Sequence, residues 1–74
     1  MSILGNISGK EAVQAFIKAG WFFQGQVGSH MVLTKPGCKV NLSVPNHKEL
    51  GIGLLRKLIR LSGMTIDEFK SLLK

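Results

Sequence analysis

This chain of 74 residues has one cysteine and no long apolar run, and both shortages narrow what it can be. With Cys38 alone, no internal disulfide can form, which fits a protein of the reducing cytoplasm. No apolar run approaches the ~18 residues that a membrane span needs, and the N-terminus lacks the basic and apolar regions of a signal peptide. We therefore expect one small cytoplasmic domain over residues 1–74 without a membrane partner, with residues 1–7 as a loose leader.

Acidic residues are also scarce, because four Asp and Glu face ten Lys and Arg, for a net charge of +6. A small domain this basic favours a polyanionic partner, most often nucleic acid, although a merely soluble basic surface has the same composition. Metal-ligand spacing is missing as well. His30, Cys38 and His47 match no recognised ligand pattern, and Asp67 and Glu68 suit the start of a helix better. We expect neither a metal nor a cofactor.

The local patterns predict a helix, three strands, a second helix and a short last helix. Both Ser8–Glu11 and Thr65–Glu68 have the form of a capping box, which starts a helix. The predicted order is a helix over 8–20, strands over 21–24, 29–34 and 38–44 with turns at 25–28 and 35–37, a helix over 54–63 and another from 65. Short strands joined by tight turns form an antiparallel meander, and helices must cover one of its faces. The fold class is therefore α+β.

The same periodicities predict which side chains face the core. In the third strand, Cys38, Val40, Leu42 and Val44 alternate with Lys39, Asn41 and Ser43. In the second helix, one face is apolar, with Leu54, Leu55, Leu58, Ile59 and Leu61. The opposite face is basic, with Arg56, Lys57 and Arg60. We expect Trp21, Phe23 and Cys38 in the core.

The best-placed side chain for chemistry is His30, in the run Gly28-Ser29-His30 at the predicted start of a strand. An imidazole can accept or donate a proton near neutral pH. The other interpretation is a structural histidine whose ring bonds a backbone group. Alternation groups His30 with Val32 and Thr34, but the residues between them are equally apolar. The sequence therefore does not decide which face of the sheet carries His30.

Several motifs in this order resemble the HicA family of toxins from bacterial toxin–antitoxin pairs. They are Ala19-Gly20-Trp21, Gly28-Ser29-His30, Lys35-Pro36-Gly37, Val44-Pro45-Asn46-His47, and the amphipathic helix from Leu54 to Gly63. The resemblance covers roughly Ser8 to Leu73. It rests on the order and spacing of these motifs rather than on any one of them. It implies a fold like that of a double-stranded RNA-binding domain, with helices on one face of the sheet.

The resemblance also implies an activity and a partner. The activity is ribosome-independent, metal-independent endoribonuclease cleavage of mRNA with His30 as the catalytic residue, and the partner is a HicB-type antitoxin that covers the active site. RNA contacts are expected from Gly28, Ser29, His47, Lys48, Arg56, Lys57 and Arg60. Arg56, Lys57 and Arg60 could instead form the solvated face of their helix. His47 could be a surface or turn residue. A second proton carrier could be His47, Lys48 or the RNA itself.

Two other functions remain possible from the sequence. A non-catalytic double-stranded RNA binder would share the element order and read A-form shape. A DNA-binding helix-turn-helix over Leu54–Leu73 is disfavoured, because Asp67 and Glu68 would begin its recognition helix with the wrong charge.

Overall fold

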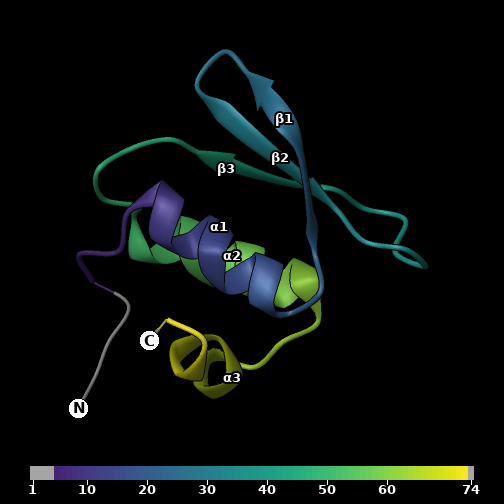
Figure 1. Ribbon diagram of the computed structural model, residues 1–74. Helices are drawn as coiled ribbons and strands as arrows, with labels where there is room; N and C mark the ends of the chain where they lie inside the picture. Colours follow the sequence, from purple (N-terminus) through teal and green to yellow (C-terminus); the bar gives the residue numbers. More distant parts are fainter. Residues whose placement is uncertain (1–4, 74) are drawn as a thin grey trace.

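The computed structural model describes residues 5–73 and has the predicted α+β architecture. In chain order the elements are α1 (Gly9–Lys18), β1 (Phe22–Val27), β2 (His30–Thr34), β3 (Leu42–Pro45), α2 (Ile52–Ser62) and α3 (Ile66–Ser71). The antiparallel sheet has the order β1-β2-β3. Helices α1 and α2 lie together on one side of the sheet, and α3 lies beyond them (Figure 1). The order and the one-sided helix layer confirm the expected likeness to a double-stranded RNA-binding domain.

Three helix ends follow the local sequence signals, whereas α1 ends at Lys18 rather than residue 20 and α2 begins at Ile52 rather than residue 54. Ser8 and Thr65 each cap a helix, and the glutamates three residues later reach back to complete both capping boxes. The second helix ends at Gly63, whose φ of 84° is the left-handed conformation that only glycine adopts without strain. Both predicted starts and this stop are therefore confirmed.

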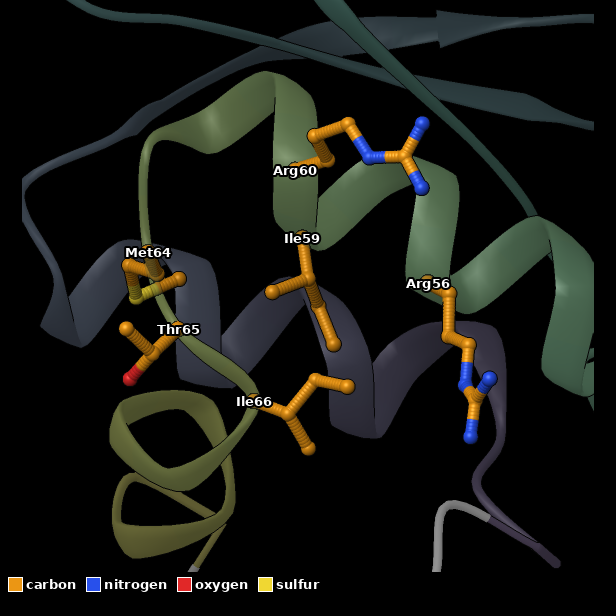
Figure 2. Close-up of a pocket in the computed structure, with 6 residues that line it drawn as sticks. All are labelled: Arg56, Ile59, Arg60, Met64, Thr65 and Ile66. Carbon is orange, nitrogen blue, oxygen red and sulfur yellow. The ribbon is translucent and has the colours of Figure 1, made fainter.

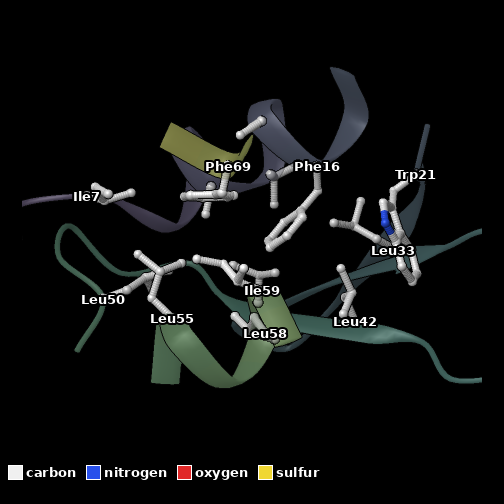
Figure 3. Close-up of a cluster of buried hydrophobic side chains, with 14 of the residues drawn as sticks. Ile7, Phe16, Trp21, Leu33, Leu42, Leu50, Leu55, Leu58, Ile59 and Phe69 are labelled. Carbon is white, nitrogen blue, oxygen red and sulfur yellow. The ribbon is translucent and has the colours of Figure 1, made fainter. Parts of the chain in front are cut away.

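The hydrophobic core lies between the sheet and the helices, and α3 adds Phe69 to it (Figure 3). The ring of Phe69 in α3 packs against Phe16 of α1 with centroids 5.1 Å apart. Trp21 is also buried, as predicted. Because Phe69 is fully buried, the short last helix is an integral part of the packing.

The strand boundaries differ from the prediction in two places. The first strand continues to Val27, so the turn is only Gly28–Ser29, with φ of 61° at Gly28. The third strand begins at Leu42, and residues 38–41 form a loop in which Cys38 is exposed. The reason is the register: pairing of β2 with β3 stops at Leu33↔Leu42, so the residues before Leu42 have no strand opposite them. The predictions of Cys38 and Val40 on the core face are both wrong, because both residues are exposed in this loop.

Three apolar predictions also fail at the margins of the core. Phe23 is 49% exposed, because it lies on the edge strand β1 beside the rim of α1. Leu54 and Leu61 are more than a third exposed, because α2 buries a narrower stripe, which includes Ser62. The expectation of a loose leader fails at Ile7. Its side chain is buried, and its carbonyl accepts a hydrogen bond from the amide of residue 50. Residues 1–4 of that leader lie outside the described residues.

Candidate functional site

Three segments that are far apart in sequence meet at one end of the sheet: the β1–β2 turn, the loop after β3 and the start of α1. The amide of Asn46 donates to the carbonyl of Ser29 at 2.7 Å, and the amide of Gly9 donates to the carbonyl of His47 at 2.9 Å. A Cβ at Gly9 would collide with the carbonyl oxygen of Pro45, so α1 approaches β3 as closely as only glycine allows. These contacts hold the Gly28-Ser29-His30 run beside the loop that bears His47.

The structure decides which face of the sheet carries His30. Along β2, Met31 and Leu33 are buried beneath the helices, whereas His30 is exposed and shares the open face with Val32 and Thr34. Successive residues of a strand point to opposite faces, so burial of one set places the other in solvent. His30 is therefore not a core histidine, and a polymer lying on the open face could reach its ring.

One side of the His30 ring is occupied by a neighbouring strand. The hydroxyl oxygen of Ser43 in β3 lies 3.4 Å from His30 Nδ1, a hydrogen bond whose direction depends on the tautomer of the ring. An Nδ1 held in this way orients the imidazole and leaves Nε2 as the nitrogen that can face a substrate. No sequence motif marks Ser43 as a site residue. Its alternation with Leu42 and Val44 already put it on the opposite face of β3, and register would have placed it beside β2.

The loop after β3 contributes two exposed side chains to this end of the molecule. His47 and Lys48 both lie in that loop, directly after the segment bonded to Ser29. The structure therefore brings together four of the predicted RNA contacts with the candidate catalytic residue: Gly28, Ser29, His47 and Lys48.

The three basic residues of α2 lie elsewhere. Arg56, Lys57 and Arg60 are exposed, but their helix covers the face of the sheet opposite to the one that carries His30. Two of them, Arg56 and Arg60, line a cavity between α2 and α3 (Figure 2). The sequence grouped all cations into one RNA surface, but the fold puts them on two sides of the sheet.

Within residues 5–73, no three side chains of the His, Cys, Asp or Glu type lie close enough together to hold a metal ion. In the same part of the chain, no helix is long and apolar enough to cross a membrane. The groups at the His30 end include imidazoles, hydroxyls and an ammonium group, which are suited to moving protons and binding phosphate.

A family model described as the HicA toxin of bacterial toxin–antitoxin systems matches residues 9–64. The chain belongs to the HicA toxin family. No curated protein matches it closely enough to add a relative. The HicA match runs from the first residue of α1 to just past the end of α2, so it includes the sheet and every residue of the site built above. Membership identifies a toxin of a toxin–antitoxin system and implies a cognate antitoxin.

Proposed function

We propose that this HicA toxin is an endoribonuclease that cleaves mRNA without the ribosome, and that His30 transfers a proton in the reaction. The observation that carries the proposal is the position of His30: exposed on the open face of the sheet, with Nδ1 beside the Ser43 hydroxyl. The HicA family is generally one of mRNA interferases, which agrees with this chemistry.

RNA supplies its own nucleophile, so the enzyme need only move protons and stabilise charge. The 2′-hydroxyl loses its proton and attacks the adjacent phosphorus, the bond to the 5′-oxygen breaks, and that oxygen takes up a proton. The products are a 2′,3′-cyclic phosphate and a 5′-hydroxyl end. His30 acts as the base for the 2′-hydroxyl or as the acid for the leaving oxygen, and such transfer contributes roughly 100- to 10,000-fold to the rate. His47, Lys48 and the RNA itself are the candidates for the other proton transfer.

The RNA is proposed to lie across the β1–β2 turn and the loop after β3. Gly28 and Ser29 have little side-chain bulk, which lets a phosphate come close to the backbone beside His30. Lys48 supplies a positive charge there, and His47 a second polar ring. The cations of α2 add to the general positive field of the domain rather than contact the scissile phosphate.

The antitoxin is proposed to be of the HicB type and to silence the toxin by covering the open face around His30. A protein seated there would exclude RNA directly. Because the toxin carries a net charge of +6, an acidic antitoxin would associate fast, and salt would slow the association.

The deciding experiment compares His30→Ala and His30→Gln with the parent in cleavage of single-stranded mRNA. The side chain is exposed, so both variants should fold and bind RNA. Both should lose about 100-fold or more of the cleavage rate, because glutamine fills the space but cannot carry the proton. A folded His30→Gln protein that cleaves at the parental rate would refute the role of His30. Duplex-selective binding by the parent, without any cleavage, would instead support the non-catalytic double-stranded RNA binder.

A further inference from the structure

A second feature of the molecule lies on the helix side, away from His30. Between α2 and α3 there is an open cavity of about 320 Å³. Its lining residues are Arg56, Ile59, Arg60, Met64, Thr65 and Ile66. Figure 2 shows the two arginines one helical turn apart on α2, with their guanidinium groups pointing in different directions and the side chains of Ile59 and Ile66 to one side of them. The cavity therefore combines an apolar floor with two cations.

Neither arginine is neutralised by the fold. In the described part of the chain, Arg56 and Arg60 form no ion pair or hydrogen bond within the domain. The nearby carboxylate of Glu68 is engaged in the capping box, where its Oε1 accepts from the Thr65 amide at 2.9 Å. No acidic side chain lines the cavity. Two guanidinium groups beside apolar side chains are complementary to a segment that carries carboxylates next to an apolar side chain.

We propose that this cavity is a docking site for the antitoxin, separate from the surface around His30. The occupant is an antitoxin segment that inserts one apolar side chain over Ile59 and Ile66 and places a carboxylate at each arginine. The proposal rests on membership in a toxin–antitoxin family and not on the nuclease chemistry of His30.

The observations favour an antitoxin over the other two occupants. RNA is the less suited occupant, because Ile59, Met64 and Ile66 offer nothing to phosphates. A second copy of this chain is poor in acid: it has four carboxylates, Glu11, Glu49, Asp67 and Glu68. Two of them, Glu11 and Glu68, are already used in capping boxes.

The test is a charge-reversal pair with a charge-matched control in the full chain. The variant is Arg56→Glu with Arg60→Glu. The control is Lys39→Glu with Lys57→Glu, which removes the same net charge at exposed positions that do not line the cavity. Long-range attraction falls equally in both, so any difference reports local contacts. The binding probe is the purified product of the reading frame adjacent to the toxin gene, and cleavage of mRNA by the toxin alone is measured beside it.

The arginine variant should bind the antitoxin about 100-fold more weakly than the control, because each glutamate opposes a carboxylate. Its cleavage of RNA in the absence of antitoxin should equal that of the control, and thermal unfolding should show both proteins folded. Equal antitoxin affinity for the two variants would overturn the proposal. A selective loss of RNA cleavage and RNA binding in the arginine variant would assign the cavity to RNA. Self-association of the toxin that only the arginine variant loses would assign it to a second copy. Loss of activity in His30→Ala bears on none of these outcomes.

Discussion

Gly9→Ala tests the close approach of α1 to β3 that holds the His30 end together. Gly9 opens α1, where alanine would ordinarily be the better residue by about 0.5–1 kcal/mol. Here the added Cβ meets the backbone oxygen of Pro45 and lies 3.1 Å from Met31 Cε. A backbone neighbour cannot rotate away, so the helix must shift and weaken the Gly9–His47 hydrogen bond of 2.9 Å.

The free energy of unfolding can be estimated from these contributions. Overpacking costs about 1–3 kcal/mol and a weakened hydrogen bond about 1 kcal/mol, offset by the helix preference of alanine. The net loss is about 2 kcal/mol, which in a domain of this size lowers Tm by about 8–16 °C. The assay is urea unfolding of the two proteins at one temperature, with thermal melting as the second measurement.

Gly53→Ala is the matched control, because Gly53 also lies in the first turn of a helix. A Cβ there has no heavy atom within 4 Å, so alanine should stabilise the domain by about 0.5–1 kcal/mol. The same substitution should therefore shift stability in opposite directions at the two glycines. A Gly9→Ala protein as stable as the parent would show that α1 and β3 are not in contact as described. It would also contradict the arrangement of the segments around His30.

Two further predictions concern the chemistry. Cleavage should persist in a strong chelator and leave a cyclic phosphate or 3′-phosphate end, because the groups beside His30 act by proton transfer; a strict need for Mg²⁺, or a 5′-phosphate product, would contradict this. Ser43→Ala should lower kcat about fivefold with little change in KM, because it frees the His30 ring without affecting RNA binding. The fivefold loss corresponds to a hydrogen bond worth about 1 kcal/mol. Ser43→Thr keeps the hydroxyl and should retain the parental kcat, and equal losses in both variants would remove Ser43 from the mechanism.

The strands were harder to predict than the helices. The predicted strand over 38–44 alternates well, yet only Leu42 to Pro45 pair with β2. Alternation shows how a segment would sit in a sheet, but a strand also needs a partner opposite it. Phe23 shows the same limit for burial, since an aromatic residue at a sheet edge is covered only as far as the neighbouring helix extends.

The amino-acid sequence by itself determined the element order, three of the helix ends and the family. Capping boxes and a C-terminal glycine act within a few residues of the chain, so Ser8, Gly63 and Thr65 could be read directly. Only the tertiary structure decided the face that carries His30 and the separation of His30 from Arg56. A strand has two equivalent sides until helices pack on one of them, and that choice depends on contacts between residues far apart in the chain.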